Sequence, residues 1–133
     1  MAVRRVKIYW LEIEDKPGSL VGLLEKAAVG NMDFECFTAF SSGHGRGRVY
    51  FCAKDPAALE ACAAGVGIEP NVAAGFIVSG PDAVGCAGAD IKGLATAGIN
   101  GVLCSAMVSG ADYKMLVVVA AEDGDAAAKV LGS

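Results

Sequence analysis

One pattern of residues occurs twice in this chain, at a constant spacing of 67 positions. Asp15 and Gly18 match Asp82 and Gly85. The same spacing relates Ala39, Ser42, Gly43, Asp55 and Gly65 to Ala106, Ser109, Gly110, Glu122 and Gly132. Few residues are identical, but the types of the predicted elements agree along the whole length. An internal repeat constrains the fold more strongly than local propensity does, because each copy must form the same supersecondary unit.

The first copy predicts the order β-α-β-β-α-β. Alternating apolar residues indicate a first strand, in which Tyr9, Leu11 and Ile13 face the helices. Apolar residues at helical spacing indicate the first helix, and Asp55-Pro56 is a cap followed by a proline that begins the second. The expected elements are strands over 3–13, 32–41, 48–53 and 68–72, and helices over 17–29 and 55–64.

The second copy repeats this order but stops early. Its expected elements are strands over 74–79, 99–108 and 113–121, and helices over 83–97 and 122–131. A counterpart of the strand at 68–72 would fall beyond the last residue. The sequence therefore predicts an α+β fold with two ferredoxin-like βαββαβ units, antiparallel sheets and helices on one face. The units are residues 1–72 and residues 73–133, the second lacking its last strand.

Composition and charge narrow the class of protein. Hydrophobic residues make up 54% and charged residues 20% of the 133 residues, which indicates a globular chain. The net charge of −4 disfavours nucleic acid as a partner. No apolar run reaches the roughly 20 residues of a membrane helix, and no signal peptide is recognisable. The five cysteines include no CxxC pair, so we expect reduced thiols in a cytoplasmic protein.

The segment from Asp15 to Leu20 is the expected turn between the first strand and the first helix. Pro17 suits the first helical position, and Asp15 or Ser19 is a candidate for the helix cap. Gly18 permits another group to approach the backbone closely. The free amides of the first helical turn lie at the positive end of the helix dipole, so they predict a site for a carboxylate.

The two turns resemble those of the ACT domain, a small regulatory ligand-binding module. In the first copy the resemblance rests on Glu14-Asp15-Lys16-Pro17-Gly18-Ser19-Leu20 and Asn31-Met32-Asp33-Phe34. In the second it rests on Gly80-Pro81-Asp82-Ala83-Val84-Gly85 and Ala97-Gly98-Ile99-Asn100. The two copies cover nearly the whole chain, which is therefore identified as a stand-alone tandem ACT protein.

The resemblance implies sheets with strand order 4-1-3-2 and an amino-acid ligand held at an interface between paired ACT units. The implied ligand-binding residues are Asp15, Lys16, Pro17, Gly18, Ser19 and Leu20, with Asn31, Met32 and Asp33. Their counterparts are Asp82, Ala83, Val84 and Gly85, with Gly98, Ile99 and Asn100. Because the second turn has Ala83-Val84 in place of the Lys-Pro pair, a second equivalent site remains an open question.

Three other features have more than one interpretation. His44 lies among glycines and is either the tip of a hairpin or part of a metal or anion site. Cys36 and Cys52 are equidistant from His44, so the hairpin could place them opposite each other, as packed thiols or as a redox pair. Trp10 lies on the strand face away from the helices, in a core or at an interface.

The function expected from these observations is non-catalytic, regulatory binding of a small molecule, an amino acid, without cofactor or metal. Two alternatives remain: a purely structural oligomerisation module, and a small thiol-based redox protein. A bare apolar edge at 74–79 would invite pairing with another chain. We therefore expect a homodimer in which Trp10, Ile8 or this edge lies in a subunit or inter-unit contact.

Overall fold

The structure is a computed structural model that describes residues 2–132. The chain forms two compact units. Residues 7–72 form the N-terminal unit, and residues 2–6 together with residues 73–132 form the C-terminal unit. The N-terminal unit ends at residue 72, and residues 2–6 belong to the C-terminal unit.

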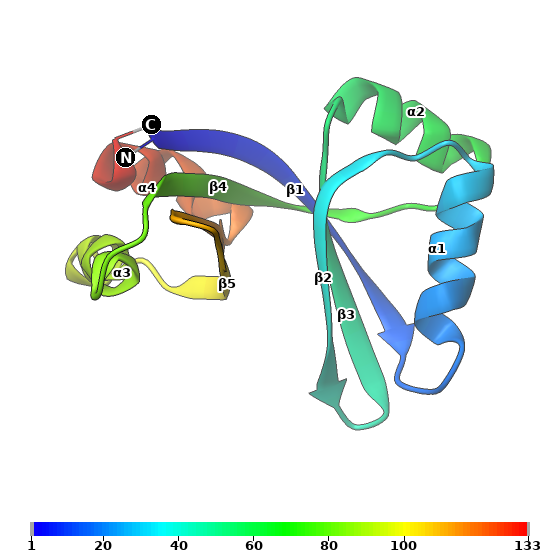
Figure 1. Cartoon of the computed structure of the whole chain (residues 1–133). Helices are drawn as coiled ribbons and strands as arrows, with labels where there is room; N and C mark the ends of the chain where they lie inside the picture. Colours follow the sequence, from blue (N-terminus) through cyan, green and yellow to red (C-terminus); the bar gives the residue numbers. More distant parts are fainter. Residues whose placement is uncertain (1, 133) are drawn as a thin grey trace. The chain divides into compact units, whose positions relative to one another are not determined.

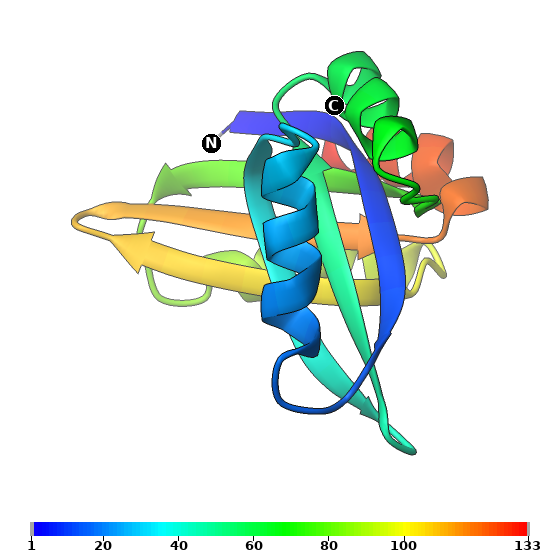
Figure 2. The same ribbon diagram turned by 90° about the vertical axis from the view of Figure 1, so that its right-hand side faces the viewer.

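The N-terminal unit is an antiparallel sheet with two helices on one face (Figures 1 and 2). Its strands have the order β2-β3-β1, and Asn71 and Val72 continue it beyond β1. Tyr9, Val49 and Phe51 pack against the helices, with Leu11 and Ile13 beside them, so the predicted inward face of the first strand is confirmed. The elements are β1 (Ala2–Glu14), α1 (Ser19–Val29), β2 (Phe34–Gly43), β3 (Arg46–Ala53) and α2 (Pro56–Gly65).

The two helices of this unit begin in different ways. The Asp55 side chain accepts a hydrogen bond from the Ala58 amide at 3.3 Å, and Pro56 is the first helical residue of α2, as predicted. Helix α1 begins at Ser19, two residues later than expected, with Gly18 at the N-cap and no side-chain cap. Pro17 therefore precedes the helix, and neither Asp15 nor Ser19 caps it.

The C-terminal unit repeats this architecture. Its strands have the order β1-β4-β6-β5, where β1 contributes residues 2–6. Both units thus have the expected order 4-1-3-2. Phe76, Val78 and Val117 are fully buried in its core, which α3 and α4 cover. The elements are β4 (Asn71–Pro81), α3 (Cys86–Thr96), β5 (Gly101–Ser109), β6 (Asp112–Val119), the short 3-10 helix η1 (Ala121–Asp123) and α4 (Gly124–Leu131).

The repeat extends to the backbone conformation. Helices α1 and α3 begin and end 67 residues apart. Gly18 and Gly85 are the N-caps, with φ of 91° and 86°. At the other helix ends, the Met32 amide donates to the Ala27 carbonyl and the Ile99 amide donates to the Leu94 carbonyl, at 2.9 and 3.0 Å. The backbone conformation at both ends of these helices is therefore the same in the two copies.

The last strand of the first copy and the first strand of the second are one element. The sequence predicts separate strands over 68–72 and 74–79, but β4 runs without interruption from Asn71 to Pro81. Residues 68–70 are not part of a strand. No turn separates the two predicted segments, because extended backbone continues directly from Asn71 into the second copy.

Residues 2–6 of β1 lie at the edge of the C-terminal unit that we expected to be bare. Val3 packs against its core, and the Arg5 guanidinium donates to the Asp125 carboxylate at 2.8 Å. Gly124, at the start of α4, has no room for a side chain, since a Cβ there would lie 2.9 Å from the Ala74 Cβ. Within residues 2–132 no strand follows α4, and the first residues of the chain occupy the position of a fourth strand in this unit.

Candidate ligand-binding site

The first strand-to-helix turn is tied to the tip of the β2–β3 hairpin. The Asp15 amide donates to the Gly45 carbonyl at 2.9 Å, and the Ser41 hydroxyl donates to the Asp15 carboxylate. Lys16 forms an ion pair with Glu14 at 2.8 Å, which lowers the pKa of the Glu14 carboxyl through the hydrogen bond and the charge of Lys16. The side chains of Asp15 and Lys16 therefore already have partners within the unit.

Gly18 is required at this turn by its backbone conformation. Its φ of 91° lies in the left-handed region, and a Cβ built on it would meet no atom within 4 Å. The Ser19 amide donates to the Lys16 carbonyl at 3.2 Å, so it closes the turn. Of the amides expected to receive a carboxylate, Ser19 is thus already engaged.

The other residues expected at this site lie at the opposite end of α1. Asn31 has a φ of 57°, Met32 is 9% exposed in the core, and Asp33 forms an ion pair with Lys54 at 3.2 Å. The 11 residues of α1 span about 16 Å. The structure therefore does not bring these residues together with the Asp15–Leu20 turn within the unit.

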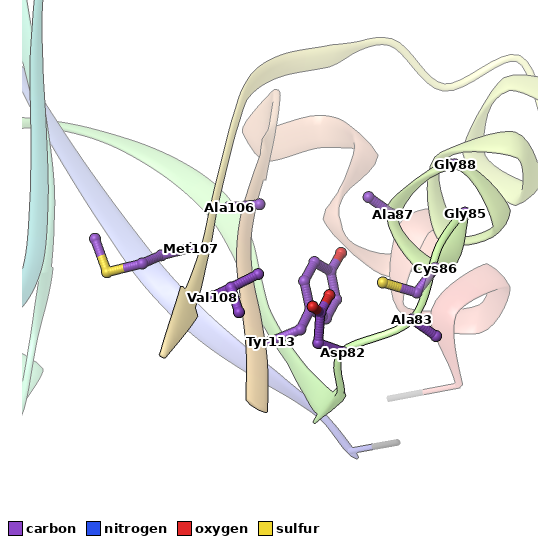
Figure 3. Close-up of a pocket in the computed structure, with 10 residues that line it drawn as sticks. All are labelled: Asp82, Ala83, Gly85, Cys86, Ala87, Gly88, Ala106, Met107, Val108 and Tyr113. Atoms are coloured by element: carbon purple, nitrogen blue, oxygen red, sulfur yellow. The ribbon is translucent and has the colours of Figure 1, made fainter. Parts of the chain in front are cut away.

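The second turn opens onto a pocket of about 280 Å³ (Figure 3). Of the counterparts expected from the sequence, Asp82, Ala83 and Gly85 line it. Val84 is fully exposed, and Gly98, Ile99 and Asn100 lie at the far end of α3. The full lining consists of Asp82, Ala83, Gly85, Cys86, Ala87, Gly88, Ala106, Met107, Val108 and Tyr113.

Small residues on α3 account for this pocket. Ala87 and Gly88 occupy the repeat positions of Leu20 and Val21. In the N-terminal unit, Leu20 packs against the core, so its side chain occupies the corresponding space. Removing that side chain leaves room between the start of α3 and strands β5 and β6. Figure 3 shows Cys86 and Tyr113 on the side facing this space, whereas the Met107 side chain points away from α3.

The polar side chains that line the pocket include the Asp82 carboxyl and the Tyr113 hydroxyl. Asp82 is exposed at its mouth, and its amide donates to the Ala111 carbonyl at 2.9 Å. The Tyr113 hydroxyl donates to the Met115 sulfur at 3.2 Å. Burial, followed by the charges of Asp90 and Cys86, raises the pKa of Tyr113, so its hydroxyl stays protonated at neutral pH. The lining contains no lysine or arginine.

Asp90 stands out among these neighbours. It occupies the repeat position of Leu23, which packs against the core in the N-terminal unit. Its Oδ2 atom is buried and has no hydrogen-bond partner among the described residues. An unpaired, buried carboxylate oxygen is costly to desolvate, so Asp90 adds negative potential beside Tyr113 at the expense of stability.

Sequence reasoning missed most of this pocket. Cys86, Ala87, Gly88, Val108 and Tyr113 were not among the expected residues. A detectable signal was the replacement of Leu20, Val21 and Leu23 by smaller or polar residues in the second copy. Asp90 was visible as a departure from the helical pattern, but the pattern does not say that a cavity results.

The other candidate residues are His44 and the cysteines. His44 and Gly45 form the two-residue tip of the β2–β3 hairpin, both with positive φ, as in a type I′ turn. All five cysteines are free. Within residues 2–132, no three His, Cys, Asp or Glu side chains cluster in a way that suits a metal ion. Nor does any helix in this range have the length and apolarity needed to cross a membrane.

The fold is shared with several solved structures. Protein BT0572 from Bacteroides thetaiotaomicron is 15% identical, with a TM-score of 0.76 over 98% of this chain and 88% of that one. The regulatory subunit of aspartate kinase from Thermus flavus is 21% identical, with a TM-score of 0.61 over 98% and 94%. Aspartate kinase from Clostridium acetobutylicum is 14% identical, with a TM-score of 0.66 over 98% of this chain and 33% of that one.

Comparison of the sequence alone gave no match: no protein-family model matches the chain, and no curated protein matches it. At these identities the likeness concerns the fold. It confirms the α+β architecture expected from the resemblance: the chain has the fold of two ACT-like βαββαβ repeats.

Proposed function

We propose that this protein is a non-catalytic regulatory protein that binds a small molecule, an amino acid, in the pocket of its C-terminal unit. The observation that carries the proposal is the 280 Å³ pocket at the start of α3. This volume lies just below the range typical of small-molecule sites, which is about 300–1,000 Å³. It suits a ligand of amino-acid size.

The charges around the pocket favour a zwitterion. The Cys86 amide donates to the Ala83 carbonyl at 3.2 Å, and Ser19 makes the equivalent bond in the first turn. The amides that follow Cys86 in α3 are therefore the ones to meet a carboxylate, at the positive end of the helix dipole. Asp82 at the mouth, reinforced by Asp90, favours an ammonium group nearby. Ala83, Ala106 and Val108 offer apolar contacts to a short side chain.

We expect the first turn to be the weaker of the two sites. The Asp15 carboxylate accepts from Ser41, Lys16 is paired with Glu14, and Leu20 is packed against the core. A ligand there would have to displace these contacts. This reverses the order expected from the sequence, in which the Lys16-Pro17 pair marked the first turn as the stronger site.

Similar folds support a regulatory rather than a catalytic role. Two of the neighbours are regulatory subunits of aspartate kinase, from Thermus flavus and Thermus thermophilus. We propose that ligand binding here likewise changes the activity of an enzyme partner, by stabilising one of two arrangements of the protein.

A thermal-shift screen of the twenty amino acids, followed by calorimetric titration, tests the proposal. A ligand at 100 times its Kd should stabilise the fold by about 2.7 kcal/mol. Ala87→Leu restores the side chain of the first copy and fills the pocket, so it should weaken binding at least tenfold. Ala89→Leu, at an exposed position on the same helix, is the matched control.

Two results would contradict the proposal. The absence of any shift with every amino acid would favour a structural oligomerisation module. Equal affinities of the Ala87→Leu and Ala89→Leu variants would move the site away from this pocket. Binding that is lost on Gly18→Val but retained in Ala87→Leu would return the site to the first turn.

A further inference from the structure

We propose that Cys36 and Cys52 are a modification site: a hydroperoxide converts this thiol pair into a reversible cross-strand disulfide. The proposal concerns the N-terminal unit and does not depend on ligand binding. It differs from the thiol-based redox alternative, because the chain is the substrate of the oxidation and not its catalyst.

The register of the hairpin brings the two residues together. Cys36 on β2 lies directly opposite Cys52 on β3. Opposed residues of an antiparallel pair project to the same face, with Cα atoms about 4.5–5.5 Å apart. Disulfides bridge Cα separations of about 4.4–6.8 Å, so the bond forms without a large backbone movement.

The two sulfurs already interact in the reduced protein. The hydrogen bond between the thiols is the largest cause of a raised pKa at Cys52, followed by burial. Cys52 is 1% exposed, and its thiol also contacts the Glu35 carboxylate at 3.7 Å. Cys36 is only half-buried. An oxidant from solution therefore reaches Cys36 first, with Cys52 in place behind it.

The position of strand β2 at the edge of the sheet permits the small backbone movement that disulfide formation still requires. Strand β2 is the outer strand of its unit, and its register shifts between Phe34 and Cys36. A bulge on an outer strand moves more easily than a strand paired on both sides. No other cysteine shares this arrangement within residues 2–132; Cys104, for example, lies opposite Val117.

The reaction balances in two steps. The Cys36 sulfur attacks one oxygen of the hydroperoxide, the O–O bond breaks, and the products are a sulfenic acid and an alcohol, or water from hydrogen peroxide. The Cys52 sulfur then attacks the sulfenic sulfur, the S–O bond breaks, and the released hydroxide takes the Cys52 proton to form water. Two thiols are oxidised and one peroxide is reduced.

Alkylation and mass spectrometry of the full chain test this inference. The freshly reduced protein should take up five alkyl groups under denaturing conditions, and the protein treated with hydrogen peroxide only three. Peptide mapping should find Cys36 linked to Cys52, with a loss of about 2 Da, and dithiothreitol should reverse it. Cys62→Ser should form the same link, whereas Cys36→Ser should form none.

Peptide mapping of the wild-type protein is enough to show whether Cys36 and Cys52 become linked, so the result does not depend on how well a variant folds. The disulfide closes a loop across the hairpin and should raise the melting temperature by about 10 °C. Five thiols remaining after peroxide treatment would overturn the proposal. So would a sulfinic acid at Cys36 without a link to Cys52, or a disulfide joining any other pair.

Discussion

Gly18 and Gly85 show how a single residue type serves the same local purpose in both copies. Each is the N-cap of its helix and has a φ near 90°, which an L-side chain adopts only with strain. The sequence suggested that glycine is there to admit another group. The open space around both Cα atoms indicates instead that the backbone conformation requires it.

Two alanine substitutions in the same segment should therefore have opposite effects. Gly18→Ala should reduce the free energy of unfolding by about 1–2 kcal/mol, because the left-handed conformation is strained. Gly22→Ala, inside α1 and free of close contacts, should increase it by about 0.5–1 kcal/mol. Urea denaturation of both variants measures the difference. Equal effects of the same sign would contradict this explanation.

Glu60 connects helix α2 to strand β1. Its carboxylate accepts hydrogen bonds from the Lys7 ammonium and from the Tyr9 hydroxyl, the latter at 2.8 Å. The hydrogen bond from Lys7, and then that from Tyr9, lower the pKa of Glu60. Burial and the bond to Glu60 raise the pKa of Tyr9, so Tyr9 remains a donor at neutral pH.

The contribution of Glu60 to stability should disappear in acid. Because its pKa is lower in the folded state than in the unfolded state, the stabilisation is complete above the unfolded value and is lost as the pH falls through the folded one. Wild type should thus be more stable than Glu60→Gln at pH 7, with the difference shrinking by pH 3. Chemical denaturation at both pH values measures it.

The same substitution at exposed Glu69 controls for the loss of one negative charge. A difference between wild type and Glu60→Gln that is as large at pH 3 as at pH 7 would show that packing, and not the ionised carboxylate, is responsible.

At the scale of elements, strand β1 belongs to both units. Its residues 2–6 lie beside β4 in the C-terminal unit, and its later residues pair with β3 in the N-terminal unit. Val3 and the Arg5–Asp125 ion pair attach the first segment to the C-terminal core. The stability of that core should therefore depend on residues at the other end of the sequence.

Substitutions in the first residues should expose this dependence. Val3→Asp should destabilise the C-terminal unit by roughly 1–3 kcal/mol, because a charge enters a partly apolar contact. Ala2→Asp, at an exposed position, should have little effect. Hydrogen exchange should accelerate in the amides of β4 and β6 in Val3→Asp while those of β2 and β3 stay protected. Uniform acceleration in both units would contradict the assignment.

At the scale of the whole molecule, two of the surfaces expected to form a homodimer contact, Ile8 and the 74–79 edge, contain residues that are buried within one chain. Ile8, Phe76 and Val78 are fully buried within the single chain, so they are not available to a second one. Strand β5 is instead the outer strand of the C-terminal unit, and most of its residues are exposed. Met107, at 73% exposure, and Val102 make this edge apolar. We propose that two chains pair there.

Sedimentation at micromolar concentration should find a dimer that dissociates on Val102→Lys, because a charge on an outer strand opposes edge pairing. Val29→Lys places the same charge on the exposed end of α1 and is the control. A wild-type monomer, or equal dissociation of both variants, would rule out β5 as the interface.

The sequence by itself determined the elements and their order. Asp55-Pro56, the glycines at 18 and 85 and the hairpin tip at His44 act within a few residues of the chain. The glycine N-caps occur in both copies, whereas the counterpart of Asp55-Pro56 lies in the 3-10 helix η1 and α4 has no side-chain cap. The strand-to-helix turn at Asp15–Leu20 could also be predicted, because it depends on residues that are adjacent in the sequence.

Cys36 and Cys52 do lie opposite each other, as their equal distance from His44 suggested, but a two-residue tip alone would pair Cys36 with Ala53. A bulge between Ser41 and Gly43 shifts the register by one residue.

Only the tertiary structure decided which strand fills the fourth position and where the pocket lies. Residues 71–72 occupy the fourth position of the N-terminal unit, and residues 2–6 occupy that of the C-terminal unit. There Val3 packs against the core and Arg5 pairs with Asp125, far away in sequence.

The pocket is a volume left between α3, β5 and β6. The pocket exists because the side chains of Ala87 and Gly88 are too small to occupy this volume, and its shape depends on the placement of Tyr113. Pattern and spacing describe which residues are present, whereas an unfilled space is defined by the distances between elements that are brought together only on folding.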